Sequence, residues 1–201
     1  SLRERWHLSA RTLRIASLPL RLGGLGLRAA TRIAPAAFCA SWADCLPVLL
    51  LRTPQLAEDI LVLLTSGAPG ASCLQALLAA AATLAAEGFD DPPTWRAFAE
   101  GARPPRPPRD EAEPGEWKHG WQYHTSSLRE TYFRRRVLLP SLPPAGRALL
   151  RSQAGPLAGR HFTVLPTLRA TTVQPELFQA LLRRRLRLRL VLSLITISDP
   201  P

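Results

Sequence analysis

The two adjacent carboxylates of this chain, Asp90 and Asp91, have the residue type but not the setting for catalysis. Paired carboxylates can hold two Mg²⁺ ions about 3.5–4 Å apart for nucleotidyl transfer. Pro92 and Pro93 follow directly, however, and a paired strand cannot continue through them. A turn that caps a helix explains the pair, because aspartate is a favoured capping residue. We therefore predict no catalytic residue in this chain.

Cysteine and histidine offer no better metal site. Five residues separate Cys39 from Cys45 and four separate His119 from His124, whereas zinc-binding cysteines usually stand about two to four residues apart. The two cysteines also fall in an apolar segment, where cysteine behaves as a small hydrophobic residue. We predict no metal ligand and no cofactor in this chain.

Arginine dominates the charged side chains. The chain has 26 Lys and Arg residues against 15 Asp and Glu, a formal net charge of +11, and Lys118 is its single lysine. Arginine binds phosphate through two parallel hydrogen bonds, so this excess favours a nucleic-acid partner. The alternative is a GC-rich genome, because Ala, Arg, Pro and Gly all have GC-rich codons and all are abundant here.

Two clusters hold the arginines that we predict to contact phosphate: Arg134, Arg135 and Arg136, and Arg183, Arg184 and Arg185. Tyr132 and Phe133 precede the first cluster, so its charge adjoins rings that can stack. Arg187 and Arg189 extend the second. The expected contact is electrostatic and independent of base sequence. A solvated basic helix end is the alternative.

The spacing of apolar residues predicts a mainly α protein. The expected helices cover residues 1–16, 28–51, 55–64, 73–87, 95–99, 116–139, 145–152 and 176–186. Pro35 and Pro47 should kink or end the second of these helices. Ser72 and Gly88 should cap the helix over 73–87. Strict alternation of Arg and Leu over 185–190 predicts a strand with arginines on one face.

Residues 101–115 are the expected domain boundary. This segment is rich in proline and charge and has no core-forming residue, as in a linker. It divides a small helical bundle at 1–100 from a second, smaller helical region at 116–190 with a basic C-terminal run. Residues 191–201 form a tail.

The expected location is intracellular, in the nucleus or the cytoplasm. Three cysteines, an odd number, indicate a reducing compartment. The longest apolar segments, Ala76–Ala86 and Leu190–Ile197, fall short of the roughly 20 residues that a membrane-spanning helix needs. The chain starts at Ser1 and contains no Met, which indicates an internal fragment.

A Gly-Gly-Leu-Gly-Leu turn follows a Leu-Pro pair within residues 18–27. Gly23, Gly24 and Gly26 permit positive φ and close backbone approach, so the segment is a tight, kinked connection. It resembles the segment that follows the polymerase palm in reverse transcriptases of non-LTR (LINE-like) retrotransposons. Three further segments are similar to the same lineage, in the same order: 34–44, 152–159 and 177–188.

The resemblance implies that residues 18–190 correspond to a thumb and a connecting helical domain, which hold the template–primer duplex. Arg21 and Arg28 would then flank a turn, built on the three glycines, that tracks an RNA or RNA–DNA backbone. The palm, with its Mg²⁺-binding aspartates, would be a missing partner, and this chain would be non-catalytic alone.

Two alternatives to this function stay open. In related elements a Cys/His-rich segment tends to follow the arginine–leucine run, and here it does not, so the chain can be a decayed relic without function. The second alternative is a helical protein-interaction scaffold. Its support is the Ala/Leu-rich helices and the proline-rich residues 103–109, which suit an aromatic groove.

Overall fold

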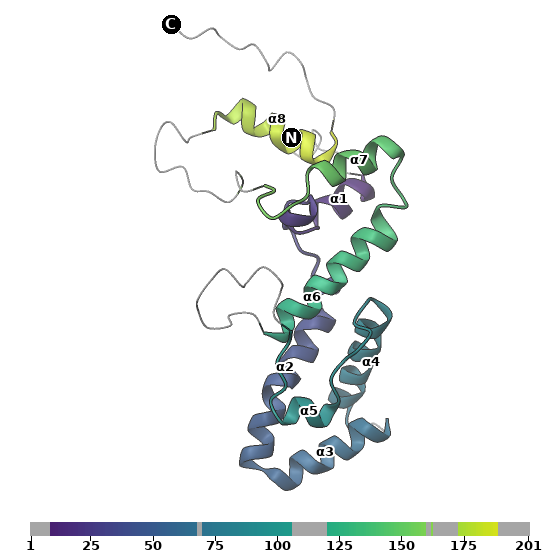
Figure 1. Cartoon of the computed structure of the whole chain (residues 1–201), viewed down its shortest axis with the longest axis vertical. Coiled ribbons are helices and arrows are strands. Elements are labelled where there is room, and N and C mark those ends of the chain that lie inside the picture. Colours follow the sequence, from purple (N-terminus) through teal and green to yellow (C-terminus); the bar gives the residue numbers. More distant parts are fainter. Residues whose placement is uncertain (1–8, 68–69, 106–119, 160–161, 163–172, 189–201) are drawn as a thin grey trace, which may run out of the picture. The chain divides into compact units, whose positions relative to one another are not determined.

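The protein is mainly helical, as the apolar spacing predicted (Figure 1). The structure is a computed structural model that describes residues 9–67, 70–105, 120–159, 162 and 173–188. Within these residues there is no strand. The chain divides into two compact units: unit 1 comprises residues 1–28 and 134–201, and unit 2 comprises Ala29–Phe133.

Unit 2 is built around one long helix, α2 (Ala30–Arg52). Four helices pack on or beside it: α3 (Pro54–Ser66), α4 (Ser72–Ala86), α5 (Trp95–Ala99) and α6 (Trp121–Tyr132). Ala36, Ala40 and Ala43 form a buried small-residue face on α2. Because alanine adds little bulk, neighbouring helices can approach this face closely.

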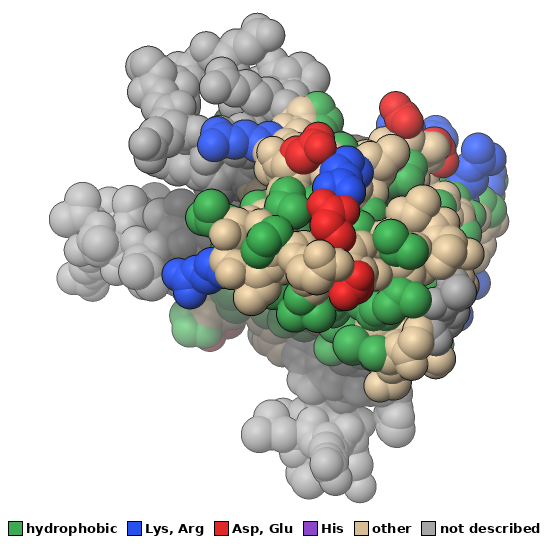
Figure 2. Space-filling view, turned by 90° about the horizontal axis from the view of Figure 1, so that it is seen from below, with side chains coloured by type: hydrophobic (Ala, Val, Ile, Leu, Met, Phe, Trp, Pro, Cys, Tyr) green, Lys and Arg blue, Asp and Glu red, His purple; other side chains and the backbone are tan. Residues whose placement is uncertain are grey.

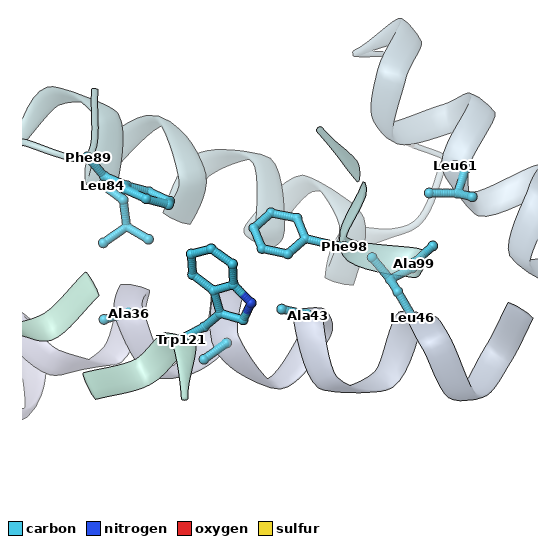
Figure 3. Close-up of a cluster of buried hydrophobic side chains, with 10 residues drawn as sticks. Ala36, Ala43, Leu46, Leu61, Leu84, Phe89, Phe98, Ala99 and Trp121 are labelled. Carbon is cyan, nitrogen blue, oxygen red and sulfur yellow. The ribbon is translucent and has the colours of Figure 1, made fainter. Parts of the chain in front are cut away.

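Aromatic rings fill the centre of unit 2 (Figure 3). The rings of Phe98 and Trp121 meet edge to face with centroids 5.0 Å apart, and Phe89 lies 6.1 Å from Trp121. Such tilted pairs add about 0.5–1.5 kcal/mol to the effect of burial alone. The buried Trp121 Nε1–H donates to the Ala102 carbonyl at 2.9 Å, so its polar atom is satisfied.

Two carboxylate–arginine pairs fasten α6 within unit 2; Glu130 of the first is buried, and Glu87 of the second is half-buried. Arg32 on α2 binds both oxygens of the buried Glu130 at 3.1 Å, and its guanidinium lies 4.2 Å from the centre of the Phe133 ring. Arg129 donates to Glu87 and to the Arg32 carbonyl. Breaking a buried pair of this kind typically costs about 3–5 kcal/mol, because one charge is left uncompensated.

Unit 1 joins the two ends of the described chain. It contains α1 (Ala10–Ala16), the 3₁₀ turn η1 (Leu20–Leu22), most of the π-helical segment η3 (Phe133–Leu138), α7 (Pro144–Ser152) and α8 (Pro175–Leu186). Its core is mainly leucine: Ile15, Leu18, Leu22, Leu138, Leu142, Leu150 and Leu186 are buried. Branched aliphatic side chains thus hold this unit together, in place of the aromatic cluster of unit 2.

Proline marks helix starts correctly but does not end α2. Pro54, Pro144 and Pro175 each occupy a first-turn position, where the missing N–H has no helical partner to lose. Pro35 and Pro47 lie inside α2, which continues through both. Of the two predicted effects, a kink or an end, the end was wrong, because packing of α2 on its neighbours outweighs two lost backbone hydrogen bonds.

Two further local predictions were wrong. Ser72 is the first residue of α4 rather than its cap, and the capping position falls on Ala71 without a side-chain hydrogen bond. Arg185 and Leu186, the start of the predicted strand, are the last residues of α8. Arg187 ends that helix with φ +59°, in the left-handed region. Residues 189–190 of the predicted strand lie outside the described residues.

The division into units falls elsewhere than residues 101–115. The described residues on both sides of this segment, through Phe133, belong to unit 2. Residues 106–119 lie outside the described part of the chain. Trp121 explains the grouping, because it comes after the proline-rich segment and packs in the same core as Phe98 before it.

Helix α2 is long and apolar enough to cross a bilayer by length and composition alone. The length of uninterrupted apolar sequence did not reveal this property, because Arg32, Asp44 and the two prolines interrupt the apolar run of α2. A core helix of a water-soluble protein passes the same test. Four helices of unit 2 pack against α2 in this structure.

Candidate nucleic-acid interface

Charge is distributed very unequally between the two units. Unit 1 contains 18 arginines, no lysine and 3 acidic residues, a formal net charge of +15. Unit 2 contains 8 basic and 12 acidic residues, a net charge of −4. On the face shown in Figure 2, acidic side chains gather among hydrophobic ones. In the described part of unit 1, Glu176 is the one carboxylate side chain.

Most described arginines of unit 1 reach solvent. The exposed ones are Arg11, Arg14, Arg21, Arg28, Arg135, Arg136, Arg151 and Arg184. This set includes five of the eight arginines predicted to contact nucleic acid, and it adds three that the sequence analysis did not single out. Because exposed guanidinium groups without carboxylate partners attract phosphate, these side chains form the candidate interface.

Arg134, the first residue of the triple-arginine run, is half-buried and lies among like charges. Burial lowers the pKa of its guanidinium, and the charges of Arg135 and Arg151 lower it further. Its Nε is buried without a hydrogen-bond partner. Arg151 lies on α7, so the fold brings a fourth guanidinium to the three of the run. An anion would relieve the repulsion within this cluster.

The glycine turn is packed inside unit 1. A Cβ on Gly24 would overlap the Leu18 carbonyl, and one on Gly23, where φ is +94°, would lie 2.7 Å from a Leu150 methyl carbon. Both residues are buried, whereas Gly26 is exposed at φ +77°. Gly23 is therefore required for its positive φ and Gly24 for its missing side chain, and both serve the packing of the turn.

Arg185 holds the glycine turn to α8. Its side chain is 4% exposed, and it donates from Nε to the Gly24 carbonyl at 2.7 Å and from Nη2 to the Leu20 carbonyl at 2.6 Å. Burial lowers the pKa of this guanidinium, yet no carboxylate among the described residues pairs with it. Its charge-assisted hydrogen bonds to two backbone oxygens take the place of a carboxylate.

The second arginine cluster is thus divided by the fold. Arg184 is exposed, Arg183 is half-buried and Arg185 is buried against the turn. Arg187 is half-buried, and burial together with the charge of Arg185 lowers its pKa. Within this cluster, Arg184 is therefore the side chain best placed to meet a ligand from solvent.

Within the described part of the chain, the acidic pair and the candidate metal ligands converge on no common site. Asp90 and Asp91 are exposed, and the cap of α5 is Thr94, which accepts from the Ala97 N–H at 3.1 Å. Burial raises the pKa of Cys39 to about 11. Among the residues that the structure describes, no three His, Cys, Asp or Glu side chains gather as metal ligands. His119 lies outside those residues.

Comparison of the chain with protein-family models, with curated proteins and with solved structures found no match. The resemblance to non-LTR reverse transcriptases therefore rests on the four sequence segments. Three of them meet inside unit 1: Gly155 N–H, in segment 152–159, donates to Arg21 O, in segment 18–27, at 2.9 Å, while Arg185, in segment 177–188, binds Gly24. The remaining segment, 34–44, lies in unit 2.

Proposed function

We propose that the protein binds the sugar–phosphate backbone of RNA or an RNA–DNA duplex through unit 1. It would do so as a non-catalytic thumb and connecting region of a non-LTR reverse transcriptase. The observation that supports this most is the net charge of +15 on unit 1, where one carboxylate, Glu176, is present among the described residues. A guanidinium surface of this kind binds phosphate without selecting a base sequence.

Codon composition does not account for this charge distribution. Both units are encoded by one gene, so a GC-rich genome would raise arginine in both to a similar degree. Instead, 18 of the 25 arginines fall in unit 1, which has 96 of the 201 residues, and 12 of the 15 acidic residues fall in unit 2. The exclusion of acid from unit 1 is what a polyanion partner requires.

Binding to an RNA–DNA duplex at several salt concentrations tests the proposal. We expect an affinity that falls steeply with salt, because each neutralised phosphate contributes about −0.9 to the slope of log K against log salt for duplex DNA. Replacing Arg135 and Arg136 by alanine should weaken binding and reduce the slope by roughly 1–2. Arg52→Ala, an exposed arginine of unit 2, is the control and should change neither.

Either of two results would contradict the proposal. One is no binding by the wild-type chain at low salt. The other is an equal loss of affinity in the unit 1 variant and in Arg52→Ala, which would place the contact outside unit 1. Under this proposal the protein works inside the cell, and the polymerase palm that would precede it in the polyprotein is its protein partner.

A second candidate function, as a helical interaction module, is favoured by one surface of unit 2. Trp42, Cys45, Val48 and Leu49 line a groove of about 390 Å³ along α2. Leu51 nearby is 84% exposed, and clustered exposed apolar side chains often mark protein contacts. A protein partner captured independently of salt and lost in Val48→Glu would favour this function over nucleic-acid binding.

A further inference from the structure

Unit 1 contains a hollow between α8 and the loop that follows α7. Its volume is about 480 Å³, within the roughly 300–1,000 Å³ of small-molecule sites. The loop over residues 152–159 forms one wall, and Leu181, Arg184 and Arg185 of α8 form the other. The wall therefore comes from two of the segments that resemble non-LTR reverse transcriptases.

The wall of this hollow is fixed by specific contacts. Gly155 has φ +143° and donates to the Arg21 carbonyl, so the loop is fastened to the glycine turn. A Cβ on Gly159 would lie 2.8 Å from a methyl carbon of Leu20 and 3.0 Å from Nη2 of Arg185. Gln153 Nε2 donates to the Arg184 carbonyl at 3.5 Å, which joins the loop to α8. A wall held at both ends is already formed before a ligand arrives.

The chemistry of the hollow is cationic at its edge and apolar inside. Arg184 is exposed, and its guanidinium forms no hydrogen bond or ion pair with the described residues. Pro156, Leu157 and Leu181 supply apolar surface, and Leu157 is 69% exposed. Carboxylates are missing from the lining. A ligand that suits these walls has one anionic group beside a flat, largely apolar body.

We propose that this hollow receives one unstacked nucleotide of a single strand, with its phosphate on Arg184 and its base against Leu181 and Pro156. The inference rests on the proposed function, because the strand is first attracted by the charge of unit 1. It adds a preference for unpaired nucleotides, since a base held within a duplex cannot leave its stack without loss of pairing and stacking energy. Every base has an apolar face, so the preference is independent of base identity.

The test compares two single strands with equal charge. One is a thymidine oligonucleotide, and the other has the same phosphates but abasic sugars. We expect the wild-type chain to bind the base-containing strand about tenfold more tightly, since only that strand buries apolar surface in the hollow. Leu181→Trp fills the hollow and should remove this difference without changing the salt dependence. Leu177→Trp, on the same helix but outside the lining, is the matched control and should keep the difference.

The outcomes separate this inference from the proposed function. Salt-dependent binding with equal affinity for the two strands would contradict nucleotide binding in the hollow, and the proposed function would still hold. A difference that persists in Leu181→Trp also overturns it. If wild-type protein binds neither strand at low salt, both proposals fail. Circular dichroism checks that Leu181→Trp is folded; if it is not, Ala158→Trp fills the hollow from the opposite wall and gives the deciding measurement.

Discussion

The two units of this protein use arginine in opposite ways. In unit 2, Arg32 and Arg129 are paired with Glu130 and Glu87, so the charges neutralise each other within the fold. In unit 1, the buried Arg185 binds two carbonyl oxygens, and the described residues offer the exposed arginines a single carboxylate side chain, Glu176. The same residue type thus holds helices together in one unit and leaves an uncompensated positive surface in the other.

This difference shows which observation bears on function. Net charge of the whole chain is +11 and hides both behaviours, because the −4 of unit 2 masks part of the +15 of unit 1. Accumulated like charge destabilises a compact state through self-repulsion. A unit that keeps such charge without balancing it is therefore more informative about a partner than the composition of the whole chain.

The largest expected effect is that of Gly24→Ala, which should unfold unit 1 while unit 2 stays folded. A Cβ here overlaps the backbone of Leu18, which no side-chain movement relieves. We expect a loss of at least about 4 kcal/mol, in the range reserved for severe core changes. Hydrogen exchange should show lost protection in α7 and α8 and retained protection in α3 and α4.

Gly70→Ala is the matched control for that change. Gly70 lies in unit 2, and a Cβ there meets a methyl carbon of Leu63 at an ordinary 3.8 Å. The free energy of unfolding should change by no more than about 0.5 kcal/mol. Equal protection of α7 and α8 in Gly24→Ala and wild type would contradict the packing of the turn.

Arg185→Met tests whether a buried arginine without a carboxylate stabilises unit 1. Methionine keeps the apolar stem but removes both hydrogen bonds, so the Gly24 and Leu20 carbonyls lose their donors. We expect a loss of about 3 kcal/mol in unit 1, since hydrogen bonds to a charged group contribute roughly 1.5–3 kcal/mol each and part is recovered by not burying a charge. Chemical denaturation followed by hydrogen exchange measures it.

Arg184→Met, the neighbouring exposed residue, serves as the control for Arg185→Met. It should leave the stability of unit 1 nearly unchanged, because its guanidinium has no partner among the described residues. A stability loss of the same size in both variants would mean that general charge, and not the two carbonyl contacts, governs unit 1.

Local signals in the sequence predicted the helices well. Apolar spacing and first-turn prolines placed α3, α7 and α8 to within a residue or two at each end. Both signals depend on neighbours within one or two helical turns, and such contacts can be inferred from spacing. Pro35 and Pro47 were misjudged because α2 is held by helices distant in sequence, which spacing along the chain does not reveal.

The candidate interface was predictable only in part, for the same reason. The arginine clusters were visible as runs, but the burial of Arg185 depends on Gly24 and Leu20, which lie about 160 residues earlier. In a sequence, an arginine whose side chain faces solvent cannot be told from one whose side chain binds a backbone carbonyl. Gly159 carried a signal that was missed, since a glycine at the end of a turn segment can make room for a large side chain.

The smallest expected effect is that of mild acid, which should lower the stability of unit 2 through protonation of His124. Burial beside Phe89 and Trp121 lowers the pKa of this imidazole below its usual value of about 6.5. The unfolded chain therefore binds a proton at His124 before the folded chain does, so stability falls as pH drops below about 6.5. His124→Phe should remove this part of the pH dependence, measured as the difference in unfolding free energy between variant and wild type from pH 7 to 5. Two other histidines, His7 and His161, belong to unit 1 but lie outside the described residues, so the assignment rests on α6: His124→Phe should remove the loss of hydrogen-exchange protection there and leave α7 and α8 unchanged. A pH response in α7 and α8 equal to that of α6 would place the titrating group elsewhere.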